Sequence, residues 1–294
     1  MIYFNIQGCH SHYLVAFSAV CKGRCNMDKL EHLKQIIGKY KSAVVAFSGG
    51  VDSTFLAWAC KTVLGDNVLL VTAQSSTYPV SELDGAKQSA ALLKCRHRII
   101  VSEETDIPGF TDNPPNRCYY CKNELFSKIK DIAFKEGFDV VFDGSNSDDL
   151  KDYRPGRKAL AELGICSPMV EAGLTKDEIR NHSKQAGLPT ATKPSFACLA
   201  SRFPYGEKIT NRKLDRVGEA ECVLREMGFT QFRVRSHGDL ARIEFVQSEM
   251  DKGWAMRGRI EEKFRESGYT YVTIDARGYR TGAMNEALKP SEMQ

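Results

Sequence analysis

The chain has 294 residues, of which 42% are apolar and 27% are charged, and its formal net charge at pH 7 is +4. These values are typical of a soluble globular protein with one large or two medium domains. They exclude a membrane-spanning chain, because no apolar run approaches the ~20 residues that cross a bilayer, and they do not indicate a nucleic-acid partner.

The cysteine content bears on the cellular compartment. Ten cysteines are many for a cytosolic chain, but nothing else in the sequence indicates secretion. The apolar residues 13–20 lack the preceding basic residue and the clear cleavage site of a signal peptide. We therefore predict a cytoplasmic protein whose free thiols serve in packing, metal binding or catalysis. Residues 1–26 fit poorly with the rest of the chain and are predicted to be a disordered extension.

Between residues 41 and 146, apolar runs typical of strands alternate with runs typical of helices. The predicted strands are 43–47, 68–73, 97–101 and 139–142. The predicted helices between them are 51–64, 81–93 and 119–135. This alternation indicates an α/β fold, a Rossmann-like parallel sheet with helices on both faces and ligands at the carboxyl ends of the strands.

The first predicted strand runs directly into the loop Ser48-Gly49-Gly50-Val51-Asp52-Ser53. A strand, a glycine-rich turn and a helix in this order present backbone N–H groups to phosphate. The loop is not a Walker A loop, because GxxxxGK[ST] and its lysine are absent. A plain turn with an N-capping serine is the alternative.

A second polar loop, FDGSNSDD, follows the strand at 139–142. Gly144 would permit a close approach by a ligand, and carboxylates such as Asp149, together with Asp52, are suited to hold Mg²⁺ on phosphates. The alternative is a polar loop with a capping aspartate.

The segment RCYYCK, residues 117–122, opens a helix. Its CxxC pair is suited to zinc, iron–sulfur or redox chemistry, but a closed metal site needs further ligands and the sequence contains no second CxxC. We favour packing for Cys118 and Cys121, and expect Tyr119 to contact a substrate.

Residues 193–207, KPSFACLASRFPYGE, join the α/β part to the C-terminal part, where a cleft between domains would lie. Lys193 and Arg202 flank Cys198 in the sequence, and nearby cations lower the pKa of a thiol and favour the thiolate nucleophile. A structural cysteine between apolar neighbours is the alternative.

The C-terminal part is predicted to be a small α+β domain. Arg233 and Arg235 alternate with apolar residues and so share one face of a strand, where they suit a mononucleotide phosphate or form a solvated face. The other predicted elements are a helix at 210–227, a strand at 241–246, a helix at 251–267 and a strand at 271–274. The predicted domains are an extension at 1–26, an ATP-binding domain at 27–192, a linker at 193–208 and a substrate or assembly domain at 209–294.

These segments, with a late DARGYRTGAMNE at residues 275–286, occur in one order and together resemble the LarE family of ATP-dependent sacrificial sulfur transferases. That family helps to make the nickel-pincer nucleotide cofactor. The resemblance covers residues 27 to about 288. The SGGVDS loop alone is shared with N-type ATP pyrophosphatases such as NAD synthetases, GMP synthetases and tRNA thiolases, and the segment around Cys198 narrows the match.

The resemblance implies that ATP adenylates a carboxylate of pyridinium-3,5-biscarboxylic acid mononucleotide. The thiolate of Cys198 then displaces AMP, and cleavage of its Cβ–S bond leaves a thiocarboxylate on the substrate and dehydroalanine in the protein. Residues 48–53, the end of the next strand at Thr72, and Gly144 are expected to bind ATP, with Mg²⁺ on Asp52 and Asp149. The residues expected near the substrate are Arg202, Glu221, Arg233 and Arg235.

Some members of the family instead take sulfur from an iron–sulfur cluster on three cysteines. Only Cys222 follows Cys198, so Cys118 and Cys121 would contribute only if the fold brings them close. We favour the sacrificial route. The resemblance also implies a homo-oligomer, a hexamer in relatives, that acts with the other proteins of nickel-pincer cofactor biosynthesis.

Two other functions use the same loop. A tRNA-thiolating or amide-forming synthetase would be expected to carry a strongly basic surface, an RNA-binding domain or a glutaminase domain, none of which is evident in the sequence. A nucleotide-binding regulator without catalysis is disfavoured by the intact Asp52, Ser53 and Cys198.

Overall fold

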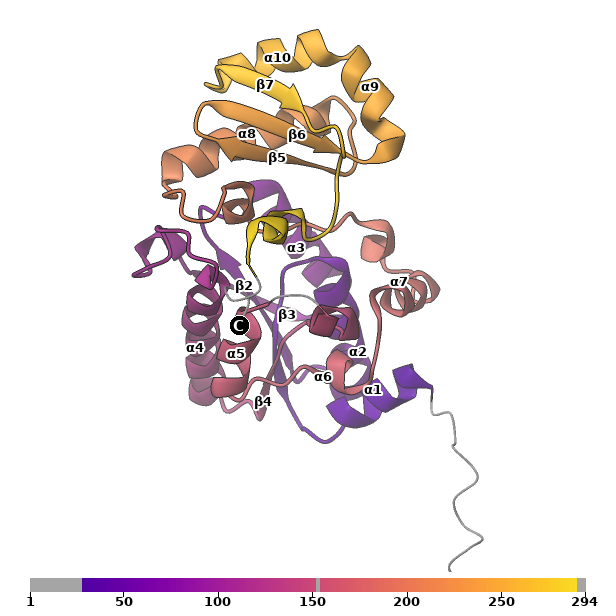
Figure 1. Cartoon of the computed structure of the whole chain (residues 1–294). Coiled ribbons are helices and arrows are strands. Elements are labelled where there is room, and N and C mark those ends of the chain that lie inside the picture. Colours follow the sequence, from indigo (N-terminus) through magenta and orange to yellow (C-terminus); the bar gives the residue numbers. More distant parts are fainter. Residues whose placement is uncertain (1–27, 152–153, 290–294) are drawn as a thin grey trace, which may run out of the picture.

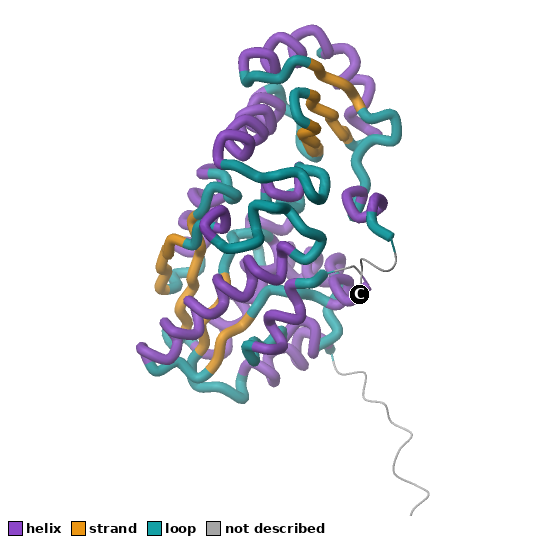
Figure 2. The backbone as a smooth tube through the Cα atoms, turned by 60° about the vertical axis from the view of Figure 1, so that its left-hand side comes forward, coloured by secondary structure: helices purple, strands orange, loops and turns teal. Residues whose placement is uncertain are grey.

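The computed structural model describes residues 28–151 and 154–289, and the extension predicted at 1–26 lies outside them. Two separate sheets lie at opposite ends of the molecule, each with its own helices (Figures 1 and 2). In the part of the chain that is described, no helix combines the length and apolar character that crossing a membrane requires.

The first sheet is parallel, with the strand order β3-β2-β1-β4. Its strands are β1 (Ala43–Ala46), β2 (Val68–Gln74), β3 (Arg96–Val101) and β4 (Val140–Phe142). Val45 of β1 packs on one face with Phe55 of the following helix, whereas Val44 packs on the other face with Phe126. Because successive strand residues point to opposite faces and both faces are covered by helices, the apolar runs are nearly continuous. The predicted α/β class is confirmed.

The helices around this sheet begin and end within two residues of the predicted positions where a prediction was made. They are α1 (Lys29–Ile37), α2 (Val51–Leu64), α3 (Val80–Leu92), α4 (Arg117–Glu136), α5 (Gly156–Glu162), α6 (Pro168–Glu171) and α7 (Lys176–Gln185). Helix α7 begins with a capping box, in which the Thr175 hydroxyl accepts from the Glu178 backbone N–H and the Glu178 carboxylate accepts from the Thr175 N–H.

The second sheet pairs β5 (Phe232–His237) antiparallel with β6 (Leu240–Phe245), and β6 parallel with β7 (Tyr271–Ile274). Helix α8 (Asn211–Glu226) packs on β5. The single helix predicted for residues 251–267 is wrong, because the chain breaks at Met256 into α9 (Met250–Ala255) and α10 (Arg257–Glu266). Gly253 lies so close to Phe245 that an added Cβ would come within 2.5 Å of the ring, and this glycine weakens the helix beside the break.

The core of the second sheet includes apolar side chains from the segment that carries Cys198, namely Leu199, Ala200 and Phe203. After β7 the chain returns toward the first sheet, as the yellow segment of Figure 1 shows, and forms a short 3₁₀ helix at Ala283–Ala287. There Asn285 Oδ1 accepts a hydrogen bond from the Tyr205 hydroxyl at 2.9 Å. The end of the described chain therefore lies against both parts of the molecule.

Candidate active site

The loop of residues 48–53 lies at the carboxyl end of β1 and at the N-terminus of α2. Gly49 has a φ of +63°, and a Cβ added there would lie 2.6 Å from the Cα of Ala86 in α3. Gly50 begins α2 without a side-chain cap. The first turn of α2 therefore presents backbone N–H groups that a phosphate can satisfy, and its dipole favours an anion there.

The close approach at Gly49 leads to a direct prediction. Gly49→Ala should lower the free energy of unfolding by more than Gly137→Ala, whose glycine also has a positive φ of 70° but nothing within 4 Å of an added Cβ. Both variants meet the left-handed strain of about 1–2 kcal/mol, and only Gly49→Ala must also displace α3. Denaturant titration measures the difference. Equal losses of unfolding free energy in the two variants would show that the close approach to Ala86 does not affect stability.

The second polar loop lies directly against the first. A Cβ added at Gly144 would lie 3.4 Å from the Cα of Ser53, so the glycine lets the two loops approach closely. Asn146 connects the two predicted magnesium ligands: its Nδ2 donates to Asp52 Oδ1 at 3.5 Å, and its backbone N–H donates to Asp149 Oδ2 at 3.0 Å. Nucleotide-bound Mg²⁺ needs only one or two carboxylates besides the phosphates, and these two residues fit that requirement.

Two lysines lie beside the loop of residues 48–53, although the sequence did not predict that either would contact it. Lys176 forms an ion pair with Asp52, and Lys193 donates to Gly49 O at 3.1 Å and pairs with Glu82 at 2.8 Å. Lys193 thus lies on the loop, although the sequence placed it beside Cys198. Lys176 did carry a signal, because it occupies the first turn of α7, where the helix dipole disfavours a cation.

Two predicted ligand residues have their hydroxyl groups engaged elsewhere. Thr72 is buried, donates to Phe47 O at 2.6 Å and lies 2.8 Å from His97 Nε2, so its hydroxyl is held inside the sheet. The Tyr119 hydroxyl donates to Glu162 at 2.7 Å, toward α5. Neither hydroxyl group is presented to a ligand in this structure.

Cys198 immediately precedes a 3₁₀ helix at Leu199–Arg202 and is exposed as a residue. Its thiol is nevertheless crowded by protein: desolvation raises the pKa of Cys198, and the Glu104 carboxylate raises it further. Thr77 and Arg117 oppose this increase without overcoming it. The predicted lowering of the thiol pKa by flanking cations is therefore wrong, because the Lys193 ammonium lies on the loop of residues 48–53 and the Arg202 guanidinium pairs with Glu221.

The CxxC segment does lie near Cys198. Cys121 Sγ is 3.7 Å from Glu104 Oε1, and desolvation, Glu104, Cys198 and Cys118 together raise the pKa of Cys121. Across residues 28–151 and 154–289, however, no three His, Cys, Asp or Glu side chains are arranged to hold a metal. These cysteines as placed do not fit an iron–sulfur cluster.

Arg202 and Glu221 form a buried ion pair, with exposed fractions of 0% and 1% for their side chains. Arg202 Nε and Nη2 donate to the two carboxylate oxygens at 2.6 and 3.0 Å. Burial acts to raise the pKa of Glu221, but the guanidinium groups of Arg202, Arg233 and Arg225 together outweigh it, Arg202 most of all, and hold the pKa below its ordinary value. Both residues are expected near the substrate, and in this structure they form an ion pair with each other.

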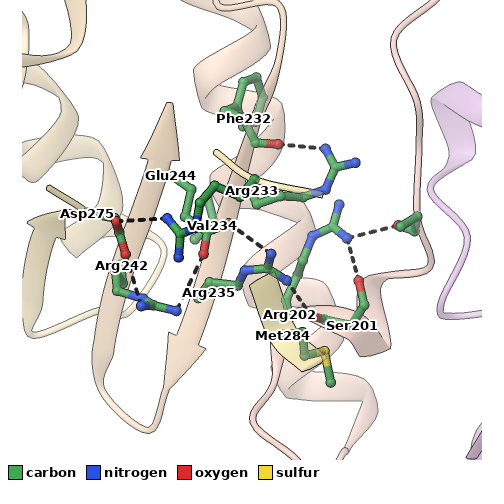
Figure 3. Close-up of polar contacts among 12 residues, drawn as sticks. Ser201, Arg202, Phe232, Arg233, Val234, Arg235, Arg242, Glu244, Asp275 and Met284 are labelled. Carbon is green, nitrogen blue, oxygen red and sulfur yellow. Dashed lines mark hydrogen bonds and ion pairs between the residues drawn. The ribbon is translucent and has the colours of Figure 1, made fainter. Parts of the chain in front are cut away.

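Three arginines hold the backbone of residues 195–201, which carry Cys198. Arg202 Nη1 donates to the carbonyl oxygens of residues 197 and 198 at 3.0 and 3.4 Å. Arg233 donates to the carbonyl of residue 195 at 2.7 Å. Arg235 donates to that of Ser201 at 2.8 Å (Figure 3). The face shared by Arg233 and Arg235 was predicted correctly, but it is buried against this segment. We call this arrangement the arginine clamp.

A cavity of about 450 Å³ opens beside the arginine clamp. Its lining includes three cationic or titratable side chains from the second sheet, Arg235, His237 and Arg242. Ser201 and Met284 also line it. A phosphate is the kind of group that such a lining suits.

No protein-family model matches the chain. An uncharacterized protein of Synechocystis sp. is 43% identical over 263 residues, which are 89% of this chain and 98% of that protein. The pyridinium-3,5-bisthiocarboxylic acid mononucleotide synthase of Lactiplantibacillus plantarum is 36% identical over 250 residues, 85% of this chain and 91% of that enzyme. The NH(3)-dependent NAD(+) synthetase of Methanoregula boonei is 24% identical over 205 residues, 62% of this chain and 77% of that enzyme.

Proposed function

The chain belongs to the family of pyridinium-3,5-bisthiocarboxylic acid mononucleotide synthases, the LarE family, and we propose that Cys198 is the sulfur donor of its reaction. The protein is an ATP-dependent, adenylating sulfur transferase. The proposed substrate is pyridinium-3,5-biscarboxylic acid mononucleotide. The observation that carries the proposal is the placement of Cys198 on a segment that three arginines hold by its carbonyl groups.

The first half-reaction is transfer of AMP from ATP to a substrate carboxylate. We place the phosphates at the N-terminus of α2, where the loop of residues 48–53 supplies N–H groups and Lys176 and Lys193 supply positive charge. A divalent metal, proposed to be Mg²⁺ on Asp52 and Asp149, would neutralise further charge when bound. Adenylation is needed because a carboxylate is a poor electrophile until AMP becomes its leaving group.

In the second half-reaction the Cys198 sulfur attacks the adenylated carbonyl carbon and AMP departs. Loss of the Cys198 α-proton then breaks the Cβ–S bond, which leaves a thiocarboxylate on the substrate and dehydroalanine in the chain. Two such events convert both carboxylates, each at the expense of one protein molecule. We propose that the substrate phosphate occupies the cavity lined by Arg235, His237 and Arg242.

The domain roles are part of the same proposal. Residues 27–192 would bind ATP, residues 193–208 would link the parts and carry Cys198, and residues 209–294 would serve substrate binding and assembly. We further propose a cytoplasmic homo-oligomer that works with the other proteins of nickel-pincer cofactor biosynthesis. The tRNA-thiolating, amide-forming and regulatory alternatives find less support, because the amide-forming relative is less similar than the synthase.

Intact-protein mass spectrometry tests the sulfur source. After incubation with ATP, Mg²⁺ and the biscarboxylate mononucleotide, we expect the protein to lose the mass of one H₂S, and peptide mapping to locate dehydroalanine at position 198. Omission of ATP is the control and should leave the mass unchanged. Thiocarboxylate product formed without this mass loss would reject the sacrificial route and indicate another sulfur donor.

A further inference from the structure

Glu104 is a buried acid beside the proposed nucleophile, with an exposed fraction of 8%. It begins the 3₁₀ helix Glu104–Asp106, just beyond the carboxyl end of β3. Its Oε1 accepts from the Cys121 thiol at 3.7 Å. Its Oε2 is buried and lacks a hydrogen bond of ordinary geometry within the described ranges, although the Ser75 and Thr77 hydroxyl groups act on the carboxyl group. A buried carboxylate oxygen that is so poorly satisfied is costly, so its retention calls for a functional explanation.

Thr77 connects Glu104 to Cys198. The Thr77 carbonyl accepts from the backbone N–H of Leu199 at 3.1 Å, which ties the cysteine segment to the loop after β2. The Thr77 side chain is near both groups, since it lowers the pKa of the Glu104 carboxyl and that of the Cys198 thiol. Thr77 is itself buried, with its hydroxyl 3.1 Å from Ser75 Oγ. A hydroxyl that both donates and accepts can relay a proton between a thiol and a carboxylate.

The charges around Cys198 create the need for a proton acceptor. Desolvation and Glu104 raise the pKa of Cys198 above an already weakly acidic value, so the sulfur is a protonated, poor nucleophile at neutral pH. Burial, with Glu103 adding to it, raises the pKa of Glu104, which makes its carboxylate a better base near neutrality. The other charged or titratable groups that face this pair are Arg117, which lowers the pKa of Cys198, and Cys121, whose own pKa is raised by both Glu104 and Cys198.

We propose that Glu104 accepts the thiol proton of Cys198, directly or through the Thr77 hydroxyl, as the sulfur attacks the adenylated substrate. The S–H bond breaks and its proton passes to the Glu104 carboxylate. The sulfur electron pair forms the new S–C bond, and the C–O bond to AMP breaks, so that AMP departs with that electron pair. No oxidant or reductant is required. The inference rests on the proposed function.

Glu104→Gln tests it, because the amide preserves the shape and cannot accept the proton. Pyrophosphate release on mixing with ATP, Mg²⁺ and the biscarboxylate mononucleotide should stay close to wild type, since the ATP loop is untouched. Sulfur transfer, followed as loss of H₂S mass, should slow by about 10²–10⁴-fold, the usual contribution of a positioned base. The defect should shrink as pH rises, because hydroxide then ionises Cys198 without Glu104.

A second measurement distinguishes proton acceptance by Glu104 from the effect of its negative charge on the Cys198 thiol. Removal of the Glu104 carboxylate should lower the pKa of Cys198, so iodoacetamide should alkylate Cys198 of resting Glu104→Gln faster than that of wild type at pH 7.5. A thiol that is more ionised and yet transfers sulfur more slowly identifies the lost function as proton acceptance. Glu103→Gln, one residue away, is the matched control and should change neither rate by a large factor.

Different results would overturn this inference and the proposed function. Sulfur transfer by Glu104→Gln at or above the wild-type rate overturns the inference, and so does slow transfer combined with slow alkylation, which means a displaced Cys198. Should Glu104→Gln fail to fold, Glu104→Asp keeps the carboxylate but withdraws it by one methylene, and the inference then requires a partial loss of transfer. Wild-type protein that neither releases pyrophosphate nor loses mass would instead reject the proposed function itself.

Discussion

Cys198→Ala is expected to release pyrophosphate from ATP in the presence of substrate but to form no thiocarboxylate. Alanine removes the sulfur that would displace AMP, whereas the loop of residues 48–53 and Lys176 lie on other segments, and Lys193 contacts that loop from five residues before Cys198. The loss of product should be complete, because the donated sulfur is itself missing. Pyrophosphate release and product formation, measured on the same sample, check both halves of the expectation.

Cys222→Ala provides the matched control. Cys222 is also exposed and lies on α8, where its thiol is 3.6 Å from Glu226, so its removal takes a thiol from the surface without touching the cysteine segment. This variant should make product at the wild-type rate. Thiocarboxylate formation by Cys198→Ala would refute the assignment of the nucleophile, even if the ATP chemistry proceeded as expected.

Arg202→Ala should have the largest effect on stability. It leaves the Glu221 carboxylate buried without its main counter-charge, and removal of one partner from a buried ion pair costs about 3–5 kcal/mol. It also frees the carbonyl groups of residues 197 and 198, so sulfur transfer should fall even where the protein remains folded. Denaturant unfolding measures the first effect, and product formation in buffer measures the second.

The double variant Arg202→Met/Glu221→Leu separates the two roles of the pair. An apolar pair of similar volume should restore part of the lost stability, since neither member of the pair then buries a charge. Recovery should be incomplete, because the Val234 N–H, which donates to Glu221, also loses its partner. Sulfur transfer should stay low, because the carbonyl contacts are still absent. Full recovery of transfer would show that the arginine clamp does not position Cys198.

The same pair predicts an acid dependence. The folded-state pKa of Glu221 lies below its ordinary value, so the pair contributes stability that is present above the unfolded pKa, near 4.3 for glutamate, and is lost as pH falls through the folded pKa. Wild-type protein should therefore lose stability in this acidic range more steeply than the double variant. Parallel unfolding curves for the two proteins across that range would contradict the assignment.

Much of the fold could be predicted because it depends on local pattern. The apolar runs around Val44 and Val71 are long, and α2 begins and ends where its residues predict. The break at Met256 was missed because it depends on tertiary contact: Gly253 packs against Phe245, and an isolated glycine in the sequence does not show what lies beside it.

The candidate site was harder to predict for the same reason. The segments that form it were recognised, but the partners of their charges were not. Sequence spacing put Arg202 next to Cys198, and the guanidinium does reach the Cys198 carbonyl, but the carboxylate that it pairs with, Glu221, could not be foreseen. Glu104 went unnoticed because a glutamate in a loop carries no local sign that it will be buried. The environment of a charge is set by the fold, and the pKa of Cys198 depends on that environment.

The return of the chain after β7 has a consequence for biosynthesis. The strands of the parallel sheet have all been synthesised once Phe142 has left the ribosome, whereas the cavity beside the arginine clamp takes lining residues up to Leu288. At roughly 5–20 residues per second, the interval between the two is on the order of ten seconds. The nascent chain can thus form the parallel strands around the loop of residues 48–53 well before the lining of this cavity is complete.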